Sequence, residues 1–135
     1  MGNYKNLETI KTLDCDNKIA LRIKLKQIAN FEFENCYQDA IVKLGSHVSL
    51  RASGAPTVDN VVFEGQYAIT RPFPNNKLAL GDAKDFLNEF DSVIGFTYKL
   101  YEELQHQKAK EEEIKKQKAE ERKKEIDKLD DFFNN

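Results

Sequence analysis

"KIALRIKLKQI", residues 18–28, is the stretch from which the fold is best predicted. Its apolar side chains are Ile19, Leu21, Ile23 and Leu25, and Lys18, Ala20, Arg22, Lys24 and Lys26 alternate with them. Successive side chains of a strand point to opposite faces, so a period of two predicts a strand with one buried face and one face in water. We therefore expect residues 18–28 to form a half-buried strand.

Other short segments alternate in the same way. "FEFENCY" (31–37) is expected to be a hairpin partner of the first strand, and "HVSLRAS" (47–53) is a further strand. "VVFEGQYAIT" (61–70) is expected to be one strand, in which Gly65 indicates a bulge or a close backbone approach. "KLAL" (77–80) fits a last short strand.

Two segments are expected to be helical. "YKNLETIKTL" (4–13) has apolar residues at helical spacing and predicts a short N-terminal helix. A long helix is expected from Asp82 to the high 120s, because its first half carries a wide apolar stripe. The stripe consists of Phe86, Phe90, Val93, Thr97, Leu100 and Leu104, widened by Leu87, Ile94, Tyr98 and Tyr101. Beyond Leu104 the repeat stops, although Glu and Lys four residues apart still favour helix.

Together these patterns predict an α+β fold. A small antiparallel sheet of four or five strands is covered by one long C-terminal helix and preceded by a short N-terminal helix. Residues 1–104 would form the folded domain, and residues 105–135 a charged projecting helix that ends in an interaction peptide.

Composition favours a binding protein over an enzyme. The net charge is −2, but residues 1–81 carry ten basic against eight acidic side chains, and residues 82–135 eleven against fifteen. Cys15, Cys36 and the two histidines, His47 and His106, fit no catalytic or metal-binding motif, so we expect no catalytic residues, metal or cofactor. No apolar run approaches the length of a membrane span. We expect a cytoplasmic protein without a membrane partner (host cytoplasm if it is viral), with reduced thiols.

The polar face of the first strand is a candidate nucleic-acid site. Lys18, Arg22, Lys24 and Lys26 form a basic row that no acidic residue interrupts. We expect Arg51 and the rings of Phe31, Phe33 and Tyr37 to join them. Cations beside rings are what a single-stranded nucleic acid requires, because phosphates need positive charge and bases stack on aromatic groups. The alternative is that these cations only solvate an exposed sheet face and that the rings belong to the core.

The second candidate is "IDKLDDFF", residues 126–133, which resembles the sliding-clamp-interacting peptide called the PIP box. Leu129 matches the aliphatic position, Phe132 and Phe133 the aromatic pair, and Asp130 and Asp131 the acidic residues common between them. Ile126 stands where that family has Gln. The resemblance implies a single 3₁₀-like turn whose apolar side chains fill a pocket on the clamp.

The same residues also have helical spacing. They could instead dock on their own domain or on a second copy of the chain, or bind another replication partner. The predicted layout also resembles the sheet-plus-helix single-stranded-DNA-binding proteins, including small archaeal and viral ones.

The leading hypothesis is a non-enzymatic accessory protein of DNA replication or repair. It would bind single-stranded DNA through the sheet and recruit a sliding clamp or another replication protein through its tail. The alternative is a structural or inhibitory interaction protein, such as a virus encodes, which self-associates as a homodimer through its long helix and binds no nucleic acid.

Overall fold

The computed structural model describes residues 4–45 and 54–134. Within these two ranges the order of elements is β1 (Thr9–Cys15), β2 (Lys18–Lys24), α1 (Phe31–Leu44), β3 (Val61–Glu64), β4 (Tyr67–Thr70), β5 (Phe73–Pro74) and α2 (Ala79–Asn134). The predicted α+β class, a small antiparallel sheet with a long C-terminal helix, is confirmed. The predicted strand 47–53, with His47 and Arg51, lies outside the described residues.

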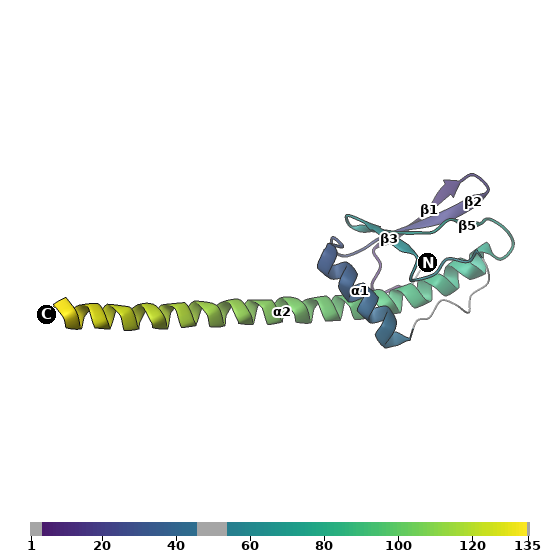
Figure 1. Cartoon of the computed structure of the whole chain (residues 1–135). Helices are drawn as coiled ribbons and strands as arrows, with labels where there is room; N and C mark the ends of the chain where they lie inside the picture. The colour runs from purple at the N-terminus through teal and green to yellow at the C-terminus, as the bar shows by residue number, and fades with distance from the viewer. Residues whose placement is uncertain (1–3, 46–53, 135) are drawn as a thin grey trace. The chain divides into compact units, whose positions relative to one another are not determined.

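The sheet has the order β1-β2-β4-β3, with β5 pairing to β2, and all pairings are antiparallel. Leu21 and Ile23 of β2 and Ala68 of β4 point to one face and are buried there. Figure 1 shows α1 and the first part of α2 on the same side of the sheet. The alternation that begins at Lys18 therefore predicted β2 correctly, although the strand ends at Lys24 rather than at residue 28.

The core lies between this inner face and the two helices. Its largest fully buried side chains include Phe33 and Tyr37 from α1 and Phe86 and Phe90 from α2. The Tyr37 ring lies edge-on to Phe63 of β3, with ring centroids 4.9 Å apart. Aromatic contacts thus join both helices and the sheet into a single hydrophobic cluster.

The short helix predicted at 4–13 is wrong, because residues 9–13 belong to β1 and residues 4–8 form turns and irregular structure. β1 and β2 pair over their whole length, from Thr9 opposite Lys24 to Cys15 opposite Lys18. Asp16, at φ 62°, begins the two-residue turn that joins them, and aspartate tolerates this left-handed conformation. The ladder to β2 outweighs the weak three-residue apolar spacing of the segment.

The strand predicted at 31–37 is also wrong, because α1 occupies these residues. The side chain of Asn30 caps the helix by accepting a hydrogen bond from the Phe33 N–H at 2.9 Å. Gly45 ends it in a left-handed conformation, at φ 65°. The two ends enclose the buried residues Phe33, Cys36, Tyr37, Ala40 and Ile41, whose three- and four-residue spacing is helical.

Three further predictions need correction. Residues 61–70 form the hairpin of β3 and β4 instead of one bulged strand, because Gly65, at φ 59°, opens a two-residue turn that leaves Glu64 opposite Tyr67. The strand predicted at 77–80 is replaced by the start of α2 at Ala79. The helix therefore begins three residues before Asp82, and it continues to Asn134 instead of ending in the high 120s.

The segment before β1 is fixed to α2. The Asn6 backbone N–H donates to Asp91 Oδ1 at 2.9 Å, and Asn6 Nδ2 donates to the Asp91 carbonyl at 3.0 Å. Gly95 makes this approach possible, because a Cβ at that position would lie 2.5 Å from Asn6 Nδ2. The chain divides into two compact units, residues 1–101 and 102–135, three residues from the boundary expected at Leu104. We call residues 102–134 the tail.

Candidate nucleic-acid interface

The second face of the sheet points away from the core, and we call it the outer sheet face. Strand pairing places directly opposite residues on the same side of a sheet, so the register defines this face. It consists of Thr9, Lys11, Leu13 and Cys15 from β1, Lys18, Ala20, Arg22 and Lys24 from β2, Tyr67 and Ile69 from β4, and Val62 and Glu64 from β3.

Positive charge gathers on the β1–β2 half of the outer sheet face. Its cations are Lys11, Lys18, Arg22 and Lys24, and no carboxylate faces outward from β1 or β2. Lys11 lies directly opposite Arg22. Like charges in directly opposite positions destabilise a sheet. The fold therefore tolerates a local electrostatic cost here, which a bound anion would relieve.

The β4–β3 half of the outer sheet face is aromatic and apolar. The Arg22 guanidinium lies over the Tyr67 ring, with its carbon 4.8 Å from the ring centroid. Ile69 lies opposite Arg22, and Val62, which is 59% exposed, lies opposite Ile69. A partly exposed ring thus borders the cations, and Glu64 is the single carboxylate that faces outward from the four strands of this ladder.

Three of the predicted basic residues lie on this face, and one does not. Lys18, Arg22 and Lys24 are on β2, whereas Lys26 follows the end of the strand. The Lys26 backbone N–H donates to the Tyr98 hydroxyl at 2.9 Å, and its Nζ lies 5.8 Å from the centroid of the Tyr98 ring. Burial raises the pKa of Tyr98, and the Lys26 hydrogen bond opposes that shift. Lys26 therefore belongs to the junction with α2, and the basic row on β2 has one residue fewer than the sequence predicted.

The predicted stacking rings are placed differently from expectation. Phe33 and Tyr37 are 0% and 1% exposed, so neither ring can stack on a base, and for these two residues the core interpretation is correct. The Tyr37 hydroxyl donates to the Val58 carbonyl, and burial raises the pKa of Tyr37 well above its ordinary value. Phe31 is 76% exposed at the first position of α1, which is not part of the outer sheet face.

The local sequence patterns did not assign Lys11 or Tyr67 to the site. Lys11 was placed on an expected helix, so its position opposite Arg22 was not anticipated. Tyr67 stands two residues before Ile69 in a segment of alternating character, and that period was the available signal. To assign these two residues one must know which strands pair with one another, and no local sequence pattern determines that pairing.

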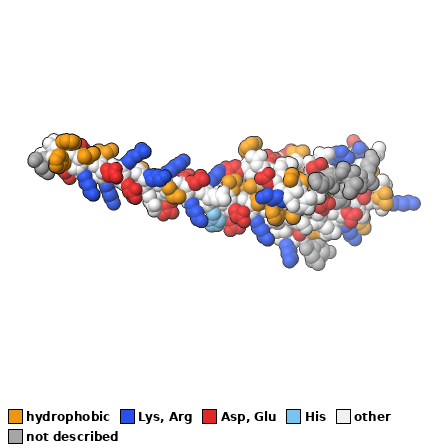
Figure 2. Space-filling model, turned by 60° about the horizontal axis from the view of Figure 1, so that its bottom comes forward, with side chains coloured by type: hydrophobic (Ala, Val, Ile, Leu, Met, Phe, Trp, Pro, Cys, Tyr) orange, Lys and Arg blue, Asp and Glu red, His pale blue; other side chains and the backbone are white. Residues whose placement is uncertain are grey.

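The second candidate site is the end of the tail. The Ile126 and Leu129 side chains are each 56% exposed, and those of Phe132 and Phe133 are 78% and 75% exposed. Figure 2 shows hydrophobic side chains gathered at this end of the helix. The two phenylalanine rings lie edge-on to each other, with centroids 5.7 Å apart.

Helical geometry sorts the tail end into two neighbouring sectors. At about 100° per residue, Ile126, Leu129 and Phe133 fall within about 60° of one another and form an apolar sector, and Phe132 lies about 60° further round the helix, beyond Leu129. Asp130, Asp127 and Asp131 follow around the helix over about 100°, starting next to Ile126. The α-helix continues through Phe133, whereas the clamp-binding resemblance implies a single 3₁₀-like turn.

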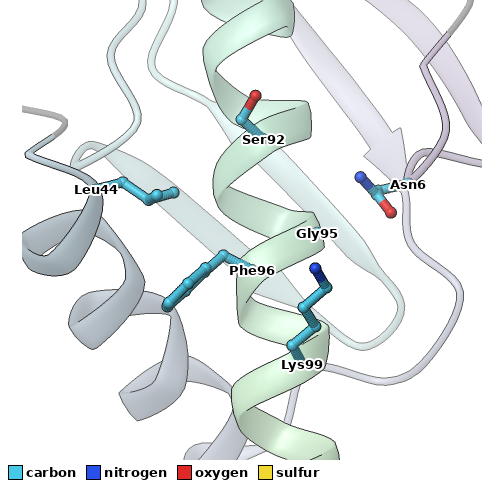
Figure 3. A pocket seen from close by; sticks show the side chains of 6 residues that line it. All are labelled: Asn6, Leu44, Ser92, Gly95, Phe96 and Lys99. Atoms are coloured by element: carbon cyan, nitrogen blue, oxygen red, sulfur yellow. The ribbon is translucent and has the colours of Figure 1, made fainter.

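The remaining surface offers little chemistry. A pocket of about 370 Å³ is lined by Asn6, Leu44, Ser92, Gly95, Phe96 and Lys99 (Figure 3). Asn6 comes from the segment before β1, Leu44 from the end of α1 and the others from α2. Among the described residues that line the pocket, Lys99 is the single charged one, and none is a histidine, cysteine or carboxylate that could pair with it for acid–base or nucleophilic catalysis.

Residues 4–45 and 54–134 contain neither a metal-binding cluster nor a membrane-spanning helix. In these ranges no three histidine, cysteine or acidic side chains gather closely enough to hold a metal ion, and no helix has the length and hydropathy needed to cross a bilayer. Cys15 and Cys36 are free thiols, and burial, together with the nearby Asp39 and Glu32 carboxylates, raises the pKa of Cys36. A raised pKa makes a thiol less reactive.

No protein-family model, curated protein or solved structure matches this chain.

Proposed function

We propose that this chain binds single-stranded nucleic acid, DNA in the first instance, through the outer sheet face. The observation that carries the proposal is the like-charged pair of Lys11 and Arg22, together with the partly exposed ring of Tyr67 under the Arg22 guanidinium. Phosphates would neutralise the cations of β1 and β2, and an unstacked base would pack against Tyr67. In this role the chain is a binding protein and accessory factor of replication or repair, and it catalyses no reaction.

The chemistry favours a single strand over a duplex. A duplex hides its base faces by stacking, so Tyr67 could contribute little to duplex binding, while the cations would act on either form. A labelled 20-nucleotide oligothymidylate, the matching oligouridylate and a duplex of the same length separate these cases by fluorescence anisotropy. We expect the single strands to bind more tightly than the duplex.

Charge reversal on the outer sheet face tests the proposal directly. The combined variant Lys11→Glu, Arg22→Glu and Lys24→Glu should abolish oligonucleotide binding at moderate salt. Removing one cation that touches a phosphate should flatten the slope of log affinity against log salt by about 0.7. Milder glutamine replacements at the same three positions should therefore lower that slope by about 2 in total.

The tail supplies a matched control. The variant Lys115→Glu, Lys116→Glu and Lys123→Glu changes the net charge by the same amount on exposed helical residues outside the sheet. If both triple variants weaken binding equally while circular dichroism shows intact folds, the interaction is diffuse attraction and the site is wrong. Tyr67→Leu should weaken single-strand binding by about 1–3 kcal/mol while Tyr67→Phe keeps it, since stacking needs the ring and not the hydroxyl.

A second candidate function concerns the tail and is supported by its exposed apolar sector. We propose that this sector binds a protein partner, since phenylalanine side chains gain about 1.5–3 kcal/mol each on full burial. A sliding clamp stays a prediction from the sequence resemblance. It requires the last helical turns to rewind, and a peptide of residues 122–135 mixed with a clamp tests it, with Ile126→Gln expected to strengthen binding.

A further inference from the structure

We propose that the end of the tail docks on the outer sheet face of a second copy of this chain. The proposal makes each of these two surfaces the partner of the other. It needs only the charges and apolar side chains of the outer sheet face, so it stands or falls separately from nucleic-acid binding.

The tail end presents acidic and apolar groups side by side. Between Glu125 and Asp131 there are four carboxylates and one lysine, which gives a net charge of −3. Three of those carboxylates, Asp127, Asp130 and Asp131, form the sector that adjoins Ile126. Phe132 and Phe133 are at least 75% exposed, so a partner surface that covered them would gain buried apolar area.

The outer sheet face is divided in the complementary way. β1 and β2 contribute the cations Lys11, Lys18, Arg22 and Lys24, and β4 and β3 contribute Tyr67, Ile69 and Val62. The boundary between the two halves runs between β2 and β4. A helix laid along this boundary can place its apolar sector over β4 and β3 and its acidic sector over β1 and β2.

The sizes of the two surfaces also agree. The segment from Ile126 to Phe133 extends about 10 Å along the helix axis, since each residue adds about 1.5 Å. Lys24 and Arg22 on β2, with Tyr67 and Ile69 opposite them on β4, occupy about 7 Å of strand at about 3.4 Å per residue. Asp130 and Asp127 then lie within reach of two cations, and Leu129 and Phe133 within reach of the apolar half.

The contact would be heterologous, because the tail of one copy meets the sheet of the next. Such contacts generate closed rings or open chains, so the assembly should grow with concentration. Opposite charges attract over shorter distances as salt increases, so the same assembly should dissociate in salt.

A charge exchange tests the contact in the full-length protein. One variant reverses the face (Arg22→Glu with Lys24→Glu), and another reverses the tail (Asp127→Lys with Asp130→Lys). In sedimentation velocity at low salt the unaltered chain should associate with increasing concentration. Either variant alone should need at least about tenfold more protein to do so, a loss of roughly 1.4 kcal/mol.

The two variants should associate again when mixed in equal amounts. The acidic tail of the first then meets the basic face of the second, and the lysine tail of the second meets the acidic face of the first. A chain that carries both reversals should also self-associate. This rescue cannot arise from misfolding, because a damaged fold would not recover on mixing.

Three results would overturn the proposal. The first is that the unaltered chain stays monomeric at all concentrations, and the second is that the two charge-reversed variants do not associate when mixed. The third is that the face-reversed variant associates normally while the variant Leu129→Ala with Phe133→Ala does not, which would mean that the contact forms between the tails of two copies. The tail-reversed variant keeps its basic face, so its oligonucleotide affinity tests the proposed function alone. If this variant binds the oligonucleotide while neither the unaltered chain nor any variant self-associates, only the docking contact is refuted.

Discussion

The two parts of α2 form one helix from unlike sequences. Up to Tyr101 the helix buries Ala79, Phe86, Leu87, Phe90, Val93, Ile94 and Thr97 against the rest of its unit. From Glu102 to Asn134 its side chains are exposed, apart from the half-buried Leu104. The first part is held by packing, and the second depends on intrinsic helix preference and on Glu and Lys spaced four residues apart.

This difference shows that helical structure and burial are separate properties of a sequence. An apolar stripe tells where a helix packs, and its end at Leu104 predicts where packing stops. It does not predict where the helix stops, because α2 continues for thirty more residues, to Asn134. Substitutions in one part should therefore leave the other part unchanged.

The largest effect is expected from Phe90→Ala. The Phe90 ring is fully buried, is stacked on Phe86 at 5.3 Å and lies 5.9 Å from Tyr37, so its removal leaves a cavity between both helices. We expect a loss of about 3–5 kcal/mol in the free energy of unfolding, measured by denaturant titration. Ile114→Ala, on the tail, is the control, and it should change that free energy by less than about 0.5 kcal/mol. Equal losses would mean that the tail is packed in solution.

A smaller loss is expected from Tyr37→Phe. The substitution keeps the ring but leaves the buried Val58 carbonyl without the hydroxyl that now donates to it. We expect about 1–3 kcal/mol of destabilisation.

The same residue predicts a pH dependence. Burial, with the Asp59 and Glu89 carboxylates nearby, raises the pKa of Tyr37 in the folded protein above its ordinary value of 10.0. The unfolded chain therefore loses this proton first, so the stabilising contribution is complete below about pH 10 and is lost as the pH rises above it. Tyr37→Phe should show a shallower decline of stability at alkaline pH than the unaltered chain. Parallel declines would show that Tyr37 does not titrate differently in the two states.

The smallest effect on stability is expected from deleting residues 105–135. The side chains of residues 105–134 are all exposed, so the thermal midpoint of the remaining unit should stay within a few degrees, equivalent to less than about 1 kcal/mol. Far-ultraviolet circular dichroism should lose helical signal at the same time. A large fall in the midpoint would place the tail in the core of the folded unit and contradict the division of α2.

Local sequence patterns correctly predicted those elements that bury the same face along their whole length. β2 and the stripe from Phe86 to Thr97 belong to this class, because each has a long, regular period. α1 was missed because Phe31 and Phe33 alternate like a strand, whereas the Asn30 cap and the four-residue step from Phe33 to Tyr37 indicate a helix.

The candidate site was predicted in part for the same reason. Lys18, Arg22 and Lys24 follow from the period of one strand. Lys11 and Tyr67 belong to the site only because β1 and β4 flank β2, which is a long-range property of the sheet. Charge patterns within one segment therefore located the β2 cations of the outer sheet face, and strand order supplied the residues of the other three strands.

The unbroken backbone of α2 has a consequence for amide hydrogen exchange. Between Phe86 and Thr97 an amide can exchange only when the packed unit opens, which requires much of the global unfolding free energy. From Glu102 onward the amides are held by helical hydrogen bonds alone, so fraying of a few turns releases them. Amides in the two parts of this single helix should therefore exchange at two different rates. The residue at which slow exchange changes to fast exchange marks the physical end of the folded unit.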